Sequence, residues 1–297
     1  MTVETELRPP ATLPVTSEPV SEPATELPFI HIHPSKGWIQ LNLRELWDYR
    51  ELAYLLAWRD VTIRYKQTVF GASWAIIQPL LMMVAFSIFF GQLAKVPSNG
   101  IPYPIFSYTA LLPWNYFAQA LTRSSNVLVG STALITKVYF PRMLLPISSV
   151  LSPLFDFAIA FVVLLGMMVY YQVYPTPAML ALPVLLAMAV MSSVGTGMWL
   201  SALNVDYRDF SNILPFLVQV WMFATPVAFS STLLDEPWRT LYGLNPMTGV
   251  IEGFRWALLG QDPMFAQMFL SALVSIVLLL TGAFYYRRTE RTFADIS

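Results

Sequence analysis

Ionisable side chains are rare in the long apolar part of this chain, so each one is a candidate for chemistry. Asp156 is the only charged residue between Met143 and Val205. An acid inside an apolar segment that crosses a membrane is a functional candidate, for example as a proton carrier. The commoner explanation is a carboxyl group held by a neighbouring helix or hydroxyl. The sequence leaves both interpretations of Asp156 open.

The residue types that many enzymes need are missing. The chain has no Cys, and its two His residues, His31 and His33, both precede the apolar part. These absences exclude thiolate chemistry and argue against histidine-based catalysis. No GxxxxGK[ST] motif for nucleotide binding is present, nor an HExxH or GxSxG motif in a usable context. We therefore expect no catalytic residue and no metal site in this chain.

Two short polar segments have the character of protein-contact surfaces. The first places aromatic residues beside cations, namely Lys137, Tyr139, Phe140 and Arg142. A short loop between membrane segments rarely needs aromatic residues, so we interpret it as a docking surface, with anchoring to lipid headgroups as the alternative. The second segment either makes a similar contact or caps the helix that follows, and its charged residues are Asp206, Arg208 and Asp209.

Two apolar segments each carry a glutamine on one face together with aromatic or methionine side chains. The two sets are Trp74, Gln78 and Phe89, and Gln219, Met222 and Phe223. A glutamine that faced lipid would be costly, so these faces should meet protein or a water-filled path. Because aromatic faces stack on the apolar faces of sugar rings, these residues are candidates for a channel lining. Ordinary packing of proline-kinked helices is the alternative.

The segment 230–262 is too short and too polar for two further membrane crossings. Asn245 followed by Pro246 is a typical helix start, with Pro at the first helical position. Glu252 and Arg255 then lie one turn apart. We predict two short helices, 237–243 and 246–259, that dip into the outer leaflet without crossing. Irregular backbone at that depth needs cover from protein or water, so we expect this segment to form an outer gate that lines an exit.

The composition favours a membrane protein. Of 297 residues, 56% are hydrophobic and 12% are charged, whereas an average soluble domain has about 45–50% and about 25%. The net charge of -1 provides no electrostatic footprint for nucleic acid. Apolar stretches of about 20 residues predict six membrane spans. These are approximately 73–93, 105–127, 144–171, 179–203, 213–229 and 264–286.

The chain divides into three regions. Residues 1–34 are rich in Pro, Glu and Thr and poor in apolar residues, so we predict a disordered cytoplasmic tail. Region 35–68 contains a basic amphipathic helix with Trp and Tyr suited to the headgroup level, and we interpret it as lying at the membrane interface. Region 69–297 is the transmembrane domain. The excess of Lys and Arg in segments on the side of the N-terminus places both termini in the cytoplasm.

Six stretches, in this order and spacing, resemble the permease subunits of ABC-2 type transporters that export polysaccharides such as O-antigen, capsule and teichoic acid. They are RDVTIRYKQTVFGASWAIIQPLL, LLPWNYF, LITKVYFPR, NVDYRDF, FATPVAF and NPMTGVIEGFRWALLG. The resemblance covers the chain from about Leu43 to Arg288. The 1–34 tail has no recognisable counterpart, and Phe70, Ala228 and Phe229 are mild departures from the family pattern.

The resemblance implies an all-α integral membrane protein with the ABC-2 exporter fold. It implies a homodimer in the bacterial inner membrane that works with two copies of a separate ATP-binding subunit. That partner would bind ATP and Mg²⁺, and this chain would hold no cofactor. The stretch LITKVYFPR resembles the family's coupling helix, and 246–259 resembles an outer gate helix. The channel would lie between the protomers, lined largely by the first and fifth spans.

The cargo that the resemblance implies is a lipid-pyrophosphate-linked polysaccharide. As a hypothesis, Arg59 and Arg64 of the interface helix attract the pyrophosphate where the cargo enters. One rival function is an ABC-2 exporter of small lipophilic molecules or lipids, which would need a smaller, more apolar cavity. A second rival is a proton-coupled flippase that uses Asp156 and needs no ATPase. A membrane glycosyltransferase is disfavoured because metal-binding acids are missing.

Overall fold

The computed structural model describes residues 43–66, 71–131, 134, 137, 139–174, 176–207 and 209–290. All of them belong to one compact unit. In this part of the chain every regular element is a helix, and no strand occurs. The expected all-α class is therefore confirmed. The predicted tail 1–34 and the start of the interface helix lie outside the described residues.

Four helical segments of the described chain are long and apolar enough to cross a membrane. They are Trp74–Leu93, Leu144–Tyr170, Pro177–Asp206 and Phe265–Thr289, and they match the first, third, fourth and sixth predicted spans. The second predicted span corresponds to α4 (Tyr103–Gly130), which is less apolar but has 28 residues, or about 42 Å at about 1.5 Å per residue. The fifth corresponds to the shorter α9 (Phe210–Phe223). The count of six spans stays a prediction.

Several of these spans are not single regular helices. In the first, α3 (Trp74–Phe86) follows a short 3₁₀ turn, η1 (Gly71–Ser73), and continues as the π-helix η2 (Ser87–Leu93). The third consists of α6 (Leu144–Leu151) and α7 (Leu154–Tyr170), separated at Pro153, because proline lacks an N–H and its ring clashes with the preceding turn. The fourth starts with η3 (Pro177–Ala181) and continues as α8 (Leu182–Asp206). The sixth is α12 (Phe265–Thr289).

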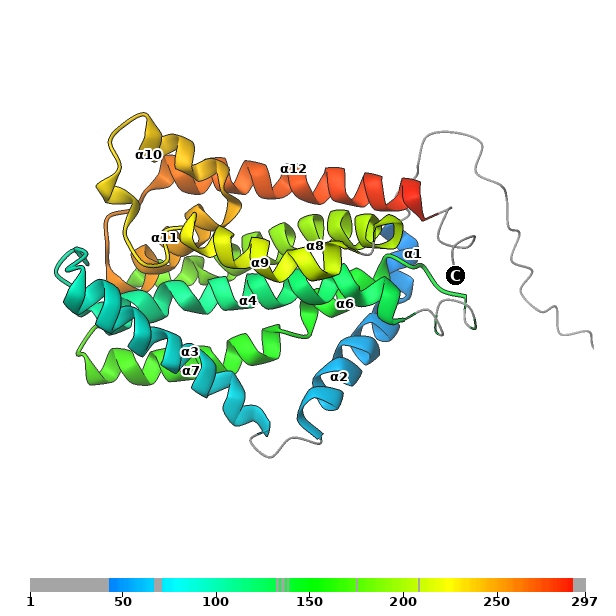
Figure 1. Cartoon of the computed structure of the whole chain (residues 1–297), viewed down its shortest axis with the longest axis horizontal. Coiled ribbons are helices and arrows are strands. Elements are labelled where there is room, and N and C mark those ends of the chain that lie inside the picture. The colour runs from blue at the N-terminus through cyan, green and yellow to red at the C-terminus, as the bar shows by residue number, and fades with distance from the viewer. Residues whose placement is uncertain are drawn as a thin grey trace, which may run out of the picture. The chain divides into compact units, whose positions relative to one another are not determined.

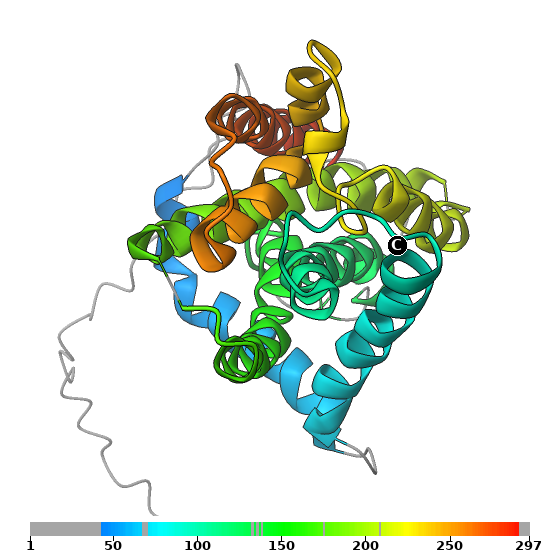
Figure 2. The same ribbon diagram turned by 90° about the vertical axis from the view of Figure 1, so that its left-hand side faces the viewer.

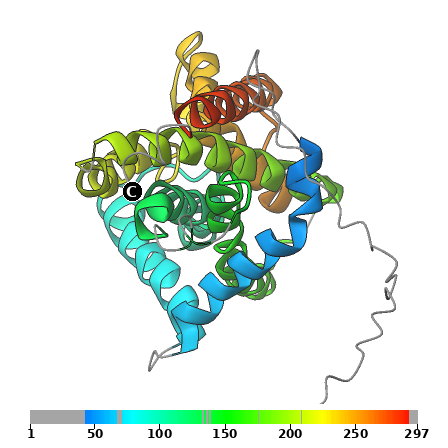
Figure 3. The ribbon, with the colours of Figure 1, turned by 90° about the vertical axis from the view of Figure 1, so that its right-hand side faces the viewer.

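The expected interface helix is present as α1 (Leu43–Asp48) and α2 (Arg50–Lys66). A turn at Tyr49 separates them, but backbone hydrogen bonds continue across it, from Tyr49 N to Glu45 O at 3.2 Å and from Ala53 N to Tyr49 O at 3.1 Å. Figure 1 shows that α2 crosses the direction of the long helices at one end of the bundle, and Figure 3 views this end with α2 lying across it. An orientation across the spans is what an interfacial helix requires.

The opposite end of the bundle is closed by short elements between α9 and α12. They are η4 (Ser231–Leu233), α10 (Trp238–Leu241), η5 (Tyr242–Leu244) and α11 (Pro246–Leu259). The predicted helix at 237–243 is thus a single α-turn followed by a 3₁₀ turn. The predicted helix at 246–259 is α11, with the same limits. Its Asn245 cap is confirmed, because Asn245 Oδ1 accepts a hydrogen bond from Met247 N at 3.1 Å.

Helix α4 forms the centre of the packing, as Figure 2 shows along the bundle. It packs against α3, α6, α7, α8, α9 and α11. Every residue from Ile105 to Trp114 is buried, so this half of α4 has protein on all sides. A helix that is enclosed in this way does not need the continuous apolar surface of a lipid-facing span, which explains its lower hydropathy.

Helices α8 and α12 approach so closely that their backbones touch. A Cβ atom at Gly195 would collide with the backbone of Leu278 and Leu279, and one at Gly282 would collide with the backbone of Gly195. The hydroxyls of Ser192 and Ser275 share a hydrogen bond of 2.8 Å across the same contact. Small residues with interhelical hydrogen bonds are the usual means of helix association in membranes, where apolar burial provides little drive.

We expect Gly195→Ala to destabilise the protein by about 1–3 kcal/mol, because overpacking a close contact forces the helices apart. The matched control is Gly166→Ala in α7, where an added Cβ has no atom within 4 Å. Thermal unfolding of the detergent-solubilised protein measures both. Equal melting temperatures for the two variants would contradict the close packing of α8 and α12.

Candidate functional site

Asp156, the lone acid of the third span, is held by two consecutive residues of α2. Arg64 forms an ion pair with one carboxylate oxygen, and the hydroxyl of Tyr65 donates a hydrogen bond to the other. Arg64 also donates to Ser152 Oγ at 3.2 Å. Burial and the hydrogen bond to Asp156 raise the pKa of Tyr65 to about 12, so the hydroxyl stays protonated as a donor at neutral pH. Of the two interpretations of Asp156, this geometry supports a carboxylate held in place by its neighbours.

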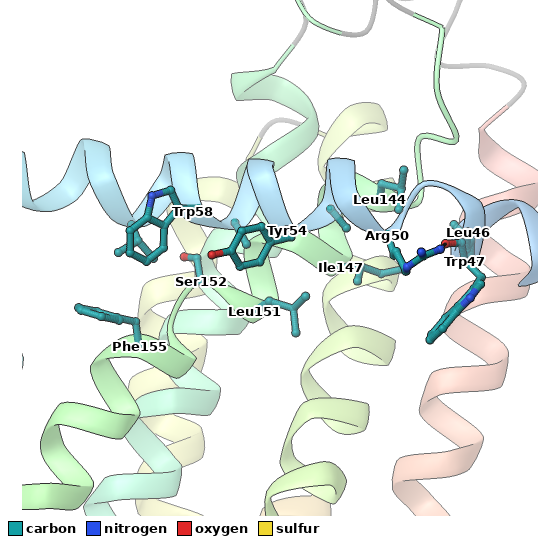
Figure 4. A pocket seen from close by; sticks show the side chains of 13 residues that line it. Leu46, Trp47, Arg50, Tyr54, Trp58, Leu144, Ile147, Leu151, Ser152 and Phe155 are labelled. Atoms are coloured by element: carbon teal, nitrogen blue, oxygen red, sulfur yellow. Dashed lines mark hydrogen bonds between the residues drawn. The ribbon is translucent and has the colours of Figure 1, made fainter.

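These contacts fix α2 across the bundle end and create an apolar groove beneath it. The groove has a volume of about 610 Å³ and lies between α1–α2 on one side and α6–α7 on the other. Figure 4 shows Tyr54 and Trp58 of α2 above Leu151 and Phe155. Tyr54 and Trp58 stack with ring centroids 6.5 Å apart, and Trp58 meets Phe155 edge-on at 6.4 Å. Aromatic residues at such a position suit the headgroup region of a bilayer.

The two cations predicted for substrate entry both have carboxylate partners. Arg59 is exposed and pairs with the adjacent Asp60 at 2.8 Å. Arg64 is less exposed and pairs with Asp156. A paired cation has less charge to offer a phosphate than an unpaired one. The hypothesis that Arg59 and Arg64 attract the cargo stays a prediction.

A second groove, between α3 and α4, is lined mainly by polar residue types. It has a volume of about 340 Å³, and its lining is Gln78, Asn115, Ala118, Gln119, Thr122 and Arg123. A small cavity of about 30 Å³ beside it is lined by Trp74, Gln78 and Asp156 among others. Of these residues, only Gln78 was predicted from the sequence as a channel-lining residue, and the polar residues of α4 were not. Asn115, Gln119 and Arg123 are spaced four residues apart, and this spacing in the sequence indicates one polar helix face.

The residues predicted to line a channel lie mostly on the surface of the protomer. On α3 and η2 the exposed side chains are Trp74, Gln78 and Phe89, and on α9 they are Gln219 and Phe223. Met222 is instead buried, on the stripe of α9 that it shares with Leu214 and Val218. The segment Trp74–Leu93 is also the least buried of the four apolar spans. Lipid or a further protein chain must cover these faces.

The segment predicted to dock a partner has an exposed and an anchored part. Lys137 and Tyr139 are exposed, with 80% of Tyr139 accessible. Phe140 is buried, and Arg142 is attached to the end of α12. Its Nη1 donates to Glu290 O at 3.1 Å, and its carbonyl accepts from the Tyr286 hydroxyl at 3.0 Å.

In the second predicted contact segment, Asp206 and Asp209 are exposed, and Arg208 lies outside the described residues. Asp209 occupies the N-cap position of α9, but its side chain makes no capping hydrogen bond. The alternative role as a cap for α9 is therefore not observed for Asp209. Contact with another protein stays a prediction for this segment.

At the other end, α11 holds the turn that follows α9. Arg255 is fully buried and donates to the carbonyls of Val227 at 2.9 Å and Phe229 at 3.0 Å. It also pairs with Glu252 at 3.4 Å, as their one-turn spacing predicted. Asn245 Nδ2 donates to Ala224 O at 3.1 Å. Because α11 is buried along nearly its whole length, an exit lined by Glu252 and Arg255 would require movement of this segment.

We expect Asp156→Asn to lower the free energy of unfolding by about 1–3 kcal/mol, because it leaves the half-buried Arg64 without its counter-ion. Asp60→Asn, which breaks the exposed pair with Arg59, should cost at most about 1 kcal/mol. Thermal unfolding in detergent measures both. A second Arg64→Leu change should add little to Asp156→Asn; fully additive losses would show that the two residues are not coupled.

Comparison with known proteins gives a consistent result. Residues 51–259 match the family described as ABC-2 type transporter. The chain is similar to the O-antigen export system permease protein RfbA of Myxococcus xanthus, with 30% identity over 261 residues, 85% of this chain and 98% of that protein. A protein of the same description from Klebsiella pneumoniae is 25% identical over 260 residues, 87% of this chain and 98% of that protein. The family match extends from α2 to α11 and includes the Arg64–Asp156 pair.

Proposed function

Because the chain belongs to the ABC-2 type transporter family, we propose that it is the membrane subunit of an ATP-driven exporter of O-antigen or a related lipid-linked glycan. The main support for the proposal is the similarity to O-antigen export permeases over 98% of their length. The apolar spans and the surface helix α2 support it. Export of a glycan is transport, so the chain itself performs no covalent chemistry.

The proposed assembly is a homodimer whose translocation path lies between the protomers. The exposed faces of α3, η2 and α9 support this arrangement, since they leave large apolar side chains uncovered in a single protomer. They also expose Gln78 and Gln219, which are costly to place against lipid. With α4 and α9 as the second and fifth spans, the protomer crosses the inner membrane six times and both termini lie in the cytoplasm. The short elements around α10 and α11 then form the outer gate.

The ABC ATPase partner, which the family implies, would dock at the end of the bundle that carries α2. Lys137, Tyr139, Asp206 and Asp209 are exposed and available for this contact. Phe140 and Arg142 serve a different role in this scheme, because they join the docking loop to the end of α12. A displacement of the loop by the ATPase would thus reach the spans directly. ATP and Mg²⁺ would be bound by that partner.

The two rival functions fit the geometry less well. A proton-coupled flippase needs an acid that is free to titrate, whereas Asp156 has a cation and a hydroxyl as partners. An exporter of small lipophilic molecules would have little use for the polar lining between α3 and α4. The lipid part of a glycan lipid would account for the apolar groove beneath α2.

We expect Tyr139→Ala to weaken binding of the ATPase subunit by about tenfold or more, because truncation of an aromatic anchor in an interface costs about 1–2 kcal/mol or more. The matched control is Tyr174→Ala, since Tyr174 is equally exposed at 80% but follows α7, whereas Tyr139 precedes α6. Titration of the purified ATPase onto the permease in nanodiscs measures binding, and glycan export in cells measures function.

Weaker ATPase binding and reduced export in Tyr139→Ala, with both unchanged in Tyr174→Ala, is the expected pattern. Wild-type affinity in both variants would contradict docking at this loop. Export by the wild-type chain with no ATPase present would contradict the proposed function itself.

A further inference from the structure

The second half of α4 has one polar strip on an otherwise buried helix. Between residues 115 and 128 the partly exposed positions recur at helical spacing and include five polar or charged residues that fall on one face. These five are Asn115, Gln119, Thr122, Arg123 and Asn126, and Asn126 is already bonded to Asn204 and to Thr122 O. The intervening positions, such as Tyr116, Leu121 and Ser124, are buried. A span enclosed on all other sides but polar on its single accessible face is typical of a wall along an aqueous path.

The strip faces a groove that a second helix completes. Gln78 of α3 lies across from the α4 residues, and together they line an open groove of about 340 Å³. The lining offers three carboxamides, which both donate and accept hydrogen bonds. The Thr122 hydroxyl can only accept, because it donates its proton to Ala118 O at 2.8 Å. Such groups match the hydroxyls of a sugar, whereas an aliphatic lipid chain would leave them unsatisfied.

Arg123 differs from Arg59 and Arg64, because no carboxylate of the described chain forms an ion pair with it. Arg59 is paired with Asp60, and Arg64 with Asp156. Among the described residues, no carboxylate lies within 4 Å of Arg123. Asp156 and Asp60 attract its guanidinium only from a longer distance. Together, Arg59, Arg64 and Arg123 carry one positive charge more than Asp60 and Asp156 can balance. An unpaired guanidinium in a partly buried groove is a site for an anion with several oxygen acceptors.

We propose that the α3–α4 groove binds the phosphate-linked end of the exported glycan lipid, with Arg123 on the phosphate oxygens and Gln78, Asn115 and Gln119 on the first sugars. This inference rests on the proposed function and names the cargo-binding residues within it. In this proposal the phosphate binds Arg123, and not Arg59 and Arg64 as the sequence predicted. The glycan then passes along the carboxamides of α3 and α4 before it meets the aromatic side chains farther along the span.

A second copy of this chain is a less suitable occupant of the groove. Helices α3 and α9, whose exposed faces are the candidates for a subunit contact, contain no acidic residue. Arg123 is itself the only charged residue of α4. A partner helix of the same sequence would therefore bury the guanidinium against apolar or amide groups, without a counter-charge. Burial of an unpaired charge is costly, whereas a phosphate supplies the missing charge.

The test uses the complete permease–ATPase complex in phosphatidylcholine nanodiscs, with polyprenyl-pyrophosphate-linked N-acetylglucosamine as the probe. We expect Arg123→Gln to raise the dissociation constant by about tenfold or more, the usual effect of losing a charge-assisted hydrogen bond. Arg123→Lys keeps the charge and should stay closer to wild type. The double variant Asn115→Leu/Gln119→Leu should weaken binding with Arg123 intact, which provides an independent result if Arg123→Gln does not fold. Arg44→Gln, an exposed cation on α1, is the control and should bind as wild type.

Each alternative gives a distinct result. Wild-type affinity in Arg123→Gln and in the double leucine variant would overturn the site while leaving the proposed function intact. Equal competition by phosphatidylglycerol would assign Arg123 to ordinary lipid headgroups and overturn it. Dissociation of the dimer in Arg123→Gln, measured by light scattering, would assign the strip to a subunit contact and also overturn it. If the wild-type complex neither binds the probe nor exports glycan in cells, the proposed function fails, and this site fails with it.

Discussion

The ion pair between Arg64 and Asp156 is the constraint that organises one end of the molecule. A carboxylate within an apolar span must be neutralised, and here the neutralising cation comes from a helix that precedes the first span. The pair, with Tyr65 and Ser152, fixes α2 across the ends of α6 and α7. It thereby creates the apolar groove beneath α2. It also commits Arg64 to Asp156, whereas Arg123 of α4 has no carboxylate within 4 Å in the described part of the chain.

A related constraint organises the opposite end. The turn after α9 carries backbone carbonyls that have no helical partners, and such groups are costly unless the protein satisfies them. Arg255 and Asn245 of the α11 region donate to three of these carbonyls. The end of α9 is therefore joined to α11. In an exporter, α9 and the outer segment would move together rather than independently, which links the wall of the path to its exit.

The elements that depend on local sequence pattern were predicted correctly. The contacts between residues far apart in the chain were not. Apolar length predicted four spans, and the Asn245–Pro246 pair predicted the start of α11 to the residue. The partners of Asp156 are 91 and 92 residues away in the chain, so no local pattern revealed them. Burial of Met222 and Arg255 depends on which helices surround them, which composition does not show. The polar face of α4 had a visible period, but its meaning needed the enclosure of α4 and the position of Gln78.

The most direct test of the account places a photo-crosslinking amino acid at Gln119 in cells that export the glycan. A second strain carries it at Val162, an exposed apolar position of α7 outside the groove. After illumination, the purified permease is probed for attached glycan. We expect a glycan adduct at position 119 and none at position 162. No adduct at position 119, or equal labelling at both positions, would contradict a glycan path along α3 and α4.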